Sequence, residues 1–383
     1  METCRKNIKE FSLYEHWIFQ DFVLKFIGTK NDKSVQFKTT MEKEINEQPQ
    51  VIENLVKSFI EENFDFCADK KIRKVKLVAS GSSYHCALLG VQLFHRYTNL
   101  DADSFYSGEF MLEENFEADN DTLFIFISQS GETYDTLECL KMIKKTNAKT
   151  LCITNCEDST LYKLCDFKLL STAGKEESIA STKALSAQLF CLALLALNYG
   201  NDEDVKNKES AIIKNLPSKI QKILDENKKL NKIISVFKKN KSTVLLGSRE
   251  CYALAKEGAL KIKETSYINT TAYPMGEFLH GHVAVLNRKI PVIVALTPDN
   301  YYSQLRVIRK IRNDYNPFII SIGTKSDDTD IKGLSNISID IDDEDFITRM
   351  FLILVIYQLI ALKTAVALNM NVDKPKGLKK VVS

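Results

Sequence analysis

This sequence has almost no excess charge of either sign. Its 383 residues include 52 Lys and Arg against 50 Asp and Glu, so the formal net charge is only +2. Proteins that bind nucleic acid or anionic membranes usually carry an excess of basic residues. The charge balance therefore gives no electrostatic reason to expect nucleic acid or a membrane as a partner.

Long hydrophobic runs and paired cysteines are also missing. The longest apolar stretches, residues 184–197 and 350–362, are each interrupted by a glutamine. Both are shorter than the roughly 18 residues that a membrane-spanning helix needs. The nine cysteines are scattered without a CxxC pair, which is typical of reduced, buried thiols. The start of the chain has no apolar signal core, so we expect a cytoplasmic globular protein.

Strand-like and helix-like segments alternate along most of the chain. Segments rich in Val, Ile and Leu predict strands at residues 74–80, 122–128, 149–154 and 166–171. Helical spacing predicts helices at residues 84–97, 135–146 and 181–197. Such alternation indicates an α/β fold with a doubly wound parallel sheet covered by helices on both faces.

The pattern then recurs along the sequence. Four strand or helix segments of the first half have counterparts 166 to 170 residues later, for example Gly81 and Gly247. This constant offset indicates an internal duplication. We therefore expect two tandem domains, with these boundaries: an extension at 1–40, a first domain at 41–200, a helical linker at 201–241, a second domain at 242–370 and a tail at 371–383. In the linker we expect a helix at 211–224 and a solvated lysine-rich loop at 238–242.

Two turns that follow predicted strands of the first domain are rich in hydroxyl groups. The turn "ISQSGETYDT" (127–136) has no lysine or arginine, and "ASGSSYHCA" leaves a second strand of the same sheet. In α/β proteins such turns bind ligands, and the free amides at the start of a helix suit a phosphate without any cation. A simple helix cap would also explain Ser and Thr at these positions. The hydroxyl-bearing candidates are Ser82, Ser83, Ser128, Ser130 and Thr133.

Three further features have both a functional and an ordinary structural interpretation. Glu257, Lys261 and Glu264 share one helix face, and such a set is often a salt-bridged surface stripe. His280, with His282 nearby, could be a core or loop residue; no further cluster completes a coordination shell, so we expect no metal. The tail "DKPKGLKKVVS" resembles a frayed basic terminus.

Several motifs together resemble one known family. "SGSSY", "SQSGETYDTL", "AGKEESIASTKA" and "EGALKIKETSYI" are similar to the sugar isomerase (SIS) family. In particular, they resemble the isomerase domain of glutamine–fructose-6-phosphate aminotransferases and related stand-alone glucosamine-6-phosphate deaminases. "MEKEINEQP", "GEFLHGHVAVL" and "VDKPKGLKKVVS" extend the resemblance from about residue 40 to the end of the sequence.

The resemblance implies a hexose 6-phosphate as substrate and assigns roles to individual residues. The phosphate would bind at the hydroxyl turns, and the sugar would lie nearby. The residues that the resemblance adds to the substrate site are Gln129, Ile179 and Ser181. Glu264 would carry a proton between C1 and C2, with Lys261 as its neighbour.

The same resemblance assigns two residues of the second half. His280 would open the sugar ring, acting in the site of a neighbouring subunit. Lys380, or less favourably Lys379, would form a Schiff base with the open-chain ketose. The loop departs from the family pattern, because Leu279 stands where a lysine is usual and His282 where a proline is usual.

The function expected first is that of a stand-alone enzyme. A synthase would need a glutaminase domain with an N-terminal cysteine, and here residue 2 is Glu. We therefore expect interconversion of glucosamine 6-phosphate with fructose 6-phosphate and ammonia, without cofactor, by a homodimer or a dimer of dimers. The alternative is the isomerase part of a glutamine–fructose-6-phosphate aminotransferase. A fructosamine-6-phosphate deglycase and a non-catalytic sugar-phosphate sensor are further alternatives.

Overall fold

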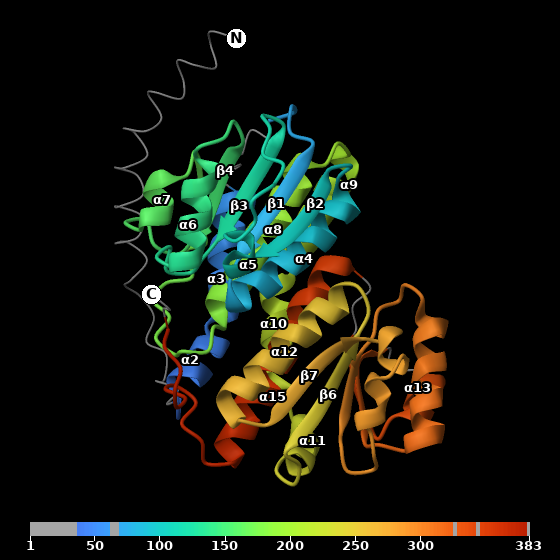
Figure 1. Cartoon of the computed structure of the whole chain (residues 1–383). Coiled ribbons are helices and arrows are strands. Elements are labelled where there is room, and N and C mark those ends of the chain that lie inside the picture. Colours follow the sequence, from blue (N-terminus) through green and yellow to red (C-terminus); the bar gives the residue numbers. More distant parts are fainter. Residues whose placement is uncertain (1–36, 62–68, 325–327, 342–344, 381–383) are drawn as a thin grey trace. The chain divides into compact units, whose positions relative to one another are not determined.

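The computed structural model describes residues 37–61, 69–324, 328–341 and 345–380 (Figure 1). The predicted extension, residues 1–40, lies almost wholly outside them. The described chain opens with α2 (Thr40–Asn46), α3 (Gln48–Val56) and the short η1 (Lys57–Glu61).

The first repeat contains a parallel five-stranded sheet. Its strands are β1 (Lys74–Ala79), β2 (Asp101–Tyr106), β3 (Thr122–Ile127), β4 (Lys149–Thr154) and β5 (Phe167–Leu170). Its helices are α4 (Gly81–Tyr97), α5 (Ser107–Phe110), α6 (Tyr134–Ile143), α7 (Thr160–Leu164) and α8 (Lys183–Tyr199). The strand order is β2-β1-β3-β4-β5, and each adjacent pair is parallel. This is a doubly wound order in which the connections change direction between β1 and β3.

The second repeat has the same topology. Its strands are β6 (Ser242–Gly247), β7 (Asn269–Pro274), β8 (Val292–Ala295), β9 (Ile319–Thr324) and β10 (Ile337–Asp340). Its helices are α12 (Glu250–Ser266), α13 (Tyr301–Tyr315), α14 (Thr329–Leu334) and α15 (Phe346–Ala367), with the short η2 (Glu277–Leu279) and η3 (His282–Val285). The order β10-β9-β8-β6-β7 is the first sheet's order read from the other edge. The predicted duplication of a doubly wound α/β domain is therefore confirmed.

Three edge strands, β2, β7 and β10, were missing from the sequence-based prediction. β2 and β7 have the sequences DADSFY and NTTAYP, which lack the Val, Ile and Leu runs of the central strands. Each pairs with only one neighbour in its sheet. An edge strand is less buried than a central one, so it tolerates the polar residues that hide it from a search for apolar segments.

The linker consists of α9 (Glu203–Ile213), α10 (Leu216–Asp225) and α11 (Leu230–Phe237). The prediction of a single helix at 211–224 is wrong, because α9 ends at Ile213 and a new helix, α10, begins at Leu216. Pro217 lies in the first turn of α10, where its missing N–H costs nothing, whereas in a helix interior it would break the hydrogen-bond ladder. The lysine-rich segment at 238–241 connects α11 to β6 and is largely exposed.

The longest apolar helix, α15, lies in the core of the second repeat. Among the described residues it alone is long and apolar enough to cross a bilayer, with a mean hydropathy of 2.1, but 83% of that window is buried inside the protein. α15 packs against α12, α10 and α11. Gly258 of α12 permits the closest approach, because a Cβ there would lie 2.6 Å from the ring of Tyr357. On another side α12 packs against α4 of the first repeat, where the two repeats meet (Figure 1).

Candidate active site

The two hydroxyl-rich turns follow β1 and β3, which flank the point where the strand order reverses. Thr133 is the N-cap residue of α6 and Ser80 that of α4, yet neither side chain caps its helix. The Ser128 hydroxyl instead accepts a hydrogen bond from the N–H of Gly131 at 3.1 Å and lies 3.0 Å from the Thr133 hydroxyl. The hydroxyls thus gather within the turn, and capping of the helices does not explain them.

Gly131 is the one position in this turn that requires glycine. Its φ of +66° lies in the left-handed region, and a Cβ there would come within 2.2 Å of the Ser159 hydroxyl oxygen. Ser130 accepts a hydrogen bond from the N–H of Glu132 at 3.2 Å, and the carbonyl of Gln129 accepts one from the N–H of Asn155 at 3.1 Å. In the other turn, Ser83 donates to the side chain of Gln188 at 3.0 Å.

The three charged residues of α12 form a buried chain of ion pairs. The Lys261 amine lies 2.6 Å from Glu264 and 3.6 Å from Glu257. The side chains of Glu257 and Lys261 are each only 1% exposed, whereas that of Glu264 is 21% exposed. The surface-stripe interpretation of this spacing is therefore wrong. This row of ion pairs begins in the interior at Glu257 and ends at Glu264, whose carboxylate reaches solvent.

Burial and charge act against each other in this chain. Burial opposes the positive charge of Lys261, but the two carboxylates outweigh it and hold the pKa of Lys261 above its ordinary value. Burial also opposes the negative charge of Glu257. Lys261 and hydrogen bonds from α4 outweigh burial there and hold the pKa of Glu257 below its ordinary value. Both groups are consequently charged near neutral pH.

Residues of α4 hold these ion pairs in place, a role that the sequence patterns did not predict. His85 is 8% exposed, and its Nδ1 lies 2.7 Å from the second oxygen of Glu257. The Ser82 side chain, which was expected to bind substrate, also hydrogen-bonds Glu257 and contributes to lowering its pKa. Ser82 and His85 are three residues apart in the first turns of α4, a spacing that places them on one helix face.

Another residue that was missed, Glu176, binds the C-terminal tail. Its Oε1 accepts hydrogen bonds from the N–H groups of Thr182 at 2.8 Å and Ala184 at 3.1 Å, so this carboxylate caps the start of α8. Its Oε2 accepts from the Ser181 hydroxyl at 3.1 Å and from the Lys380 amine at 2.5 Å. The amine also donates to the carbonyl of Ser178 at 2.8 Å. Glu176 adds to the charge that raises the pKa of Lys261, so the two groups interact electrostatically.

The tail is anchored along its described length. Both carboxylate oxygens of Asp373 accept backbone hydrogen bonds at the start of α2, from Thr40 at 2.9 Å and Met41 at 2.8 Å. Its carbonyl accepts from the N–H of Ile179 at 3.1 Å. A frayed terminus is therefore the wrong interpretation for residues 371–380. Lys380 is partly buried by these contacts, whereas Lys379 is exposed.

The loop that carries His280 lies at the surface of the chain. His280 is exposed, and its ring makes no hydrogen bond or ion pair with any residue that the structure describes. His282 lies against Tyr273, with ring centroids 4.5 Å apart, and Leu279 packs against the apolar core of the second repeat. The fold of one chain thus gathers the α12 residues and the tail lysine, but it leaves His280 facing outward.

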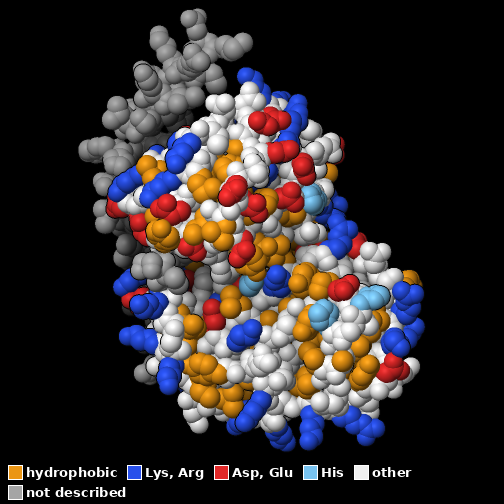
Figure 2. Space-filling view, in the orientation of Figure 1, with side chains coloured by type: hydrophobic (Ala, Val, Ile, Leu, Met, Phe, Trp, Pro, Cys, Tyr) orange, Lys and Arg blue, Asp and Glu red, His pale blue; other side chains and the backbone are white. Residues whose placement is uncertain are grey.

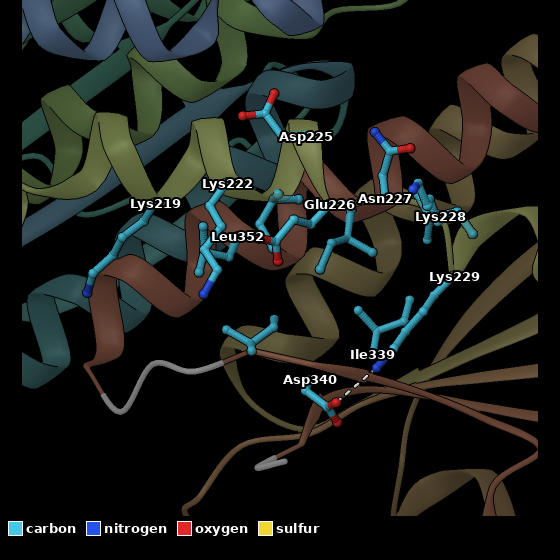
Figure 3. A pocket seen from close by; sticks show the side chains of 14 residues that line it. Lys219, Lys222, Asp225, Glu226, Asn227, Lys228, Lys229, Ile339, Asp340 and Leu352 are labelled. Carbon is cyan, nitrogen blue, oxygen red and sulfur yellow. Dashed lines mark hydrogen bonds and ion pairs between the residues drawn. The ribbon is translucent and has the colours of Figure 1, made fainter.

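One groove in the described part of the chain lies away from these residues. It has a volume of about 610 Å³ and is bounded by α10, α11, β10 and α15 (Figure 3). Its rim carries lysines and acids, including the Lys229–Asp340 ion pair at 2.9 Å, and its floor is apolar. None of the candidate site residues lines it. Within the described residues, His, Cys, Asp and Glu side chains form no group suited to hold a metal ion.

Comparison with known proteins agrees with this architecture. The SIS domain profile matches residues 70–198 and 236–368, one match for each repeat. The chain belongs to the SIS domain family. It is 34% identical over 355 residues to the glutamine–fructose-6-phosphate aminotransferase (isomerizing) of Aquifex aeolicus, covering 91% of this chain and 58% of that protein. The chain therefore spans less than two thirds of that relative's length.

Solved structures give the same result. The C-terminal domain of glucosamine–fructose-6-phosphate aminotransferase from Francisella tularensis matches with a TM-score of 0.82 and 27% identity, covering 90% of this chain and all of that one. A glucosamine-6-phosphate deaminase from Thermotoga maritima matches with a TM-score of 0.71 over 90% of this chain and 99% of that one, but at 24% identity it supports only the fold. These likenesses favour the alternative stated above, the isomerase part of an aminotransferase, over the stand-alone deaminase expected first.

Proposed function

We propose that this SIS chain carries the isomerase site of a glutamine–fructose-6-phosphate aminotransferase. It would convert fructose 6-phosphate and ammonia into glucosamine 6-phosphate. The observation that carries this proposal is the buried chain from Glu257 through Lys261 to the partly exposed Glu264. Such an arrangement supplies a fixed carboxylate for moving a proton, and it lies in a protein whose relatives are isomerising aminotransferases.

Substrate binding would begin at the phosphate. The turn after β3 offers free helix amides and the hydroxyls of Ser128, Ser130 and Thr133, which suit a dianion without a cation. The turn after β1 adds Ser83. Gln129 would also contact the phosphate. Ile179 and Ser181 would contact the sugar, and both belong to the segment that holds Glu176 and the tail.

Lys380 would bind the open-chain ketose. Its amine must lose a proton before it can attack C2, and Glu176, whose Oε2 lies 2.5 Å away, can accept that proton. Attack on the carbonyl forms the C–N bond, and the carbonyl oxygen leaves as water. Ammonia would then replace the lysine nitrogen on C2 and release Lys380.

Glu264 would carry out the isomerisation. It would take a proton from C1 of the imine and return it to C2, which turns the ketose imine into the amino aldose. The Lys261 amine at 2.6 Å keeps the carboxylate in one position and offsets its charge as it gains and loses the proton.

The ring-opening residue would come from a second copy of the chain. His280 is exposed in its own chain, and the partner subunit's His280 would complete the site. Hydrophobic side chains are exposed where the two halves of the molecule meet (Figure 2). Tyr106 there is 41% exposed, and the Lys256 amine lies 5.5–5.9 Å from the ring centroids of Tyr84, Tyr106 and Tyr252. Burial already lowers the pKa of Lys256. This patch supports a homodimer or a dimer of dimers.

One assay separates this function from the others. The chain is incubated with fructose 6-phosphate and either ammonium or glutamine, and glucosamine 6-phosphate is measured. Product from ammonium supports the proposal, and product from glutamine would show that this chain also supplies ammonia. Conversion only of glucosamine 6-phosphate to fructose 6-phosphate would favour a deaminase. Release of another amine from a fructosamine 6-phosphate would favour a deglycase, and binding without turnover would favour a sensor.

A further inference from the structure

We propose that His85 is a positioning residue for the proton carrier Glu264, acting through Glu257 and Lys261. The inference rests on the proposed function, because it concerns the proton step at Glu264. His85 belongs to the first repeat and Glu257 to the second, so this contact fixes the catalytic helix of one repeat on the phosphate-side helix of the other.

The geometry supports one continuous path. His85 Nδ1 lies 2.7 Å from Oε2 of Glu257, and Oε1 of the same carboxylate lies 3.6 Å from the Lys261 amine. That amine lies 2.6 Å from Glu264. Among the described residues, Oε1 of Glu257 accepts no hydrogen bond. The orientation of the carboxylate therefore depends on its hydrogen bonds from α4, where the His85 ring at 2.7 Å is the partner of Oε2 and the Ser82 side chain is a second, weaker contributor.

Burial makes this dependence strong. Glu257 is 1% exposed and His85 is 8% exposed, so water cannot readily replace a lost hydrogen bond. Without the histidine donor, the buried carboxylate would rotate toward the Lys261 amine. The amine would then be shared differently between its two carboxylates, and Glu264 would move relative to the substrate carbons. A displacement of about 1 Å is enough to lower a rate by about 10²-fold.

A purely structural role would behave differently. If His85 only fastened α4 to α12, its loss would lower the stability of the fold and would weaken substrate binding along with the rate. A positioning role instead predicts a lower rate at saturating substrate while the dissociation constant hardly changes. It also predicts rescue by any side chain that places a donor where Nδ1 lies.

The test uses two side chains of similar shape at position 85. Asparagine places its amide nitrogen near the position of Nδ1, whereas leucine fills about the same space without a donor. Exchange of the C1 protons of fructose 6-phosphate with deuterated water is followed at saturating substrate, and binding is measured by calorimetry. His85→Leu should lower the exchange rate about 10- to 100-fold with the dissociation constant within about twofold. His85→Asn should exchange within a few-fold of the wild type.

The controls keep the result decisive. His95→Ala changes an exposed histidine at the other end of α4 and should leave the exchange rate unchanged. If His85→Leu does not fold, His85→Gln replaces it, because glutamine retains an amide but places it near Nε2 and should lower the rate. Exchange at the wild-type rate in His85→Leu or its replacement, or no rescue by His85→Asn in a folded protein, would overturn this inference alone. No exchange in the wild type, despite binding, would overturn the proposed function as well.

Discussion

The two repeats share one strand order but differ at the ends of their central strands. In the first repeat, the hydroxyls of Ser128 and Thr133 in the turn after β3 lie 3.0 Å apart. In the second repeat, the equivalent turn after β8 is closed by a side chain. Gln304 donates to the carbonyl of Thr297 at 2.8 Å and accepts from its N–H at 3.2 Å. The turn that we propose to bind phosphate in the first repeat therefore corresponds to a turn held by a glutamine side chain in the second.

The helices α4 and α12 also differ, but here it is the second repeat that carries the additional polar groups. α4 and α12 each have 17 residues. Counted from the helix starts, the positions of Glu257, Lys261 and Glu264 are occupied in α4 by Leu88, Gln92 and His95. Only the second repeat therefore carries the buried charge chain. Under the proposed function, the first repeat would bind the phosphate and the second would move the proton, and the packing of α4 against α12 joins the two.

The largest effect is expected from removing the proton carrier of the second repeat. Glu264→Gln keeps the shape of the side chain but cannot accept a proton, so exchange of the C1 protons of fructose 6-phosphate should fall by about 10²- to 10⁴-fold. Binding of fructose 6-phosphate should persist, because the phosphate turns belong to the first repeat. Proton NMR in deuterated buffer measures the exchange. Lys263→Gln, at an exposed position one residue away, is the control, and undiminished exchange in Glu264→Gln would place the carrier elsewhere.

The next-largest effect tests whether His280, in the second repeat of one subunit, acts in the active site of its partner. His280→Ala and Glu264→Gln should each be inactive alone. Mixed under conditions that exchange subunits, they form heterodimers in which one site carries both lesions and the other carries neither. Up to half of the wild-type activity per heterodimer should return. Heterodimers confirmed by native mass spectrometry but lacking activity would mean that His280 acts within its own chain.

Much of this division of labour could be predicted from local sequence patterns. The central strands, the duplication and the hydroxyl turns depend on residues close together in the chain, and the structure has the predicted pair of doubly wound parallel sheets. The burial of Glu257 and Lys261 could not be predicted, because the same i, i+4 spacing occurs on exposed helices. Contacts such as His85–Glu257 and Glu176–Lys380 span 172 and 204 residues. They depend on how α4 meets α12 and where the tail crosses α8, which no local pattern specifies.

A moderate effect is expected from the hydroxyls of the first repeat. Ser130→Ala combined with Thr133→Ala removes two donors to the expected phosphate, and each hydrogen bond to a charged group is worth about 1.5 to 3 kcal/mol. The dissociation constant of fructose 6-phosphate, measured by calorimetry, should rise while the fold remains intact. Ser303→Ala, an exposed position near the start of the equivalent helix α13, should have no effect. Equal affinity in the double variant would mean that these hydroxyls serve only the turn.

The smallest effect compares one buried carboxylate from each half by its response to pH. Glu44 of α2 accepts hydrogen bonds from the backbone of Glu177 at 2.5 Å and of Ser178 at 3.2 Å, next to the Lys380 site. Burial raises the pKa of Glu44 above 4.5 despite these bonds, whereas the pKa of Glu257 lies below 4.5 because Lys261 and α4 outweigh burial. The two carboxylates should therefore affect stability in opposite directions.

The signs follow from which state binds the proton more tightly. Folded Glu44 holds its proton more tightly than the unfolded chain does, so its ionisation costs stability as the pH rises from 4.5 through its folded pKa. Glu257 contributes stability above 4.5 that is lost as the pH falls through its lower folded pKa. Urea unfolding between pH 4 and 7 should thus show Glu44→Gln gaining stability relative to the wild type as the pH rises. Glu257→Gln should lose stability relative to the wild type over the same range. Parallel pH profiles for the two variants would contradict the prediction that Glu44, beside the tail, and Glu257, in the second repeat, affect stability in opposite directions.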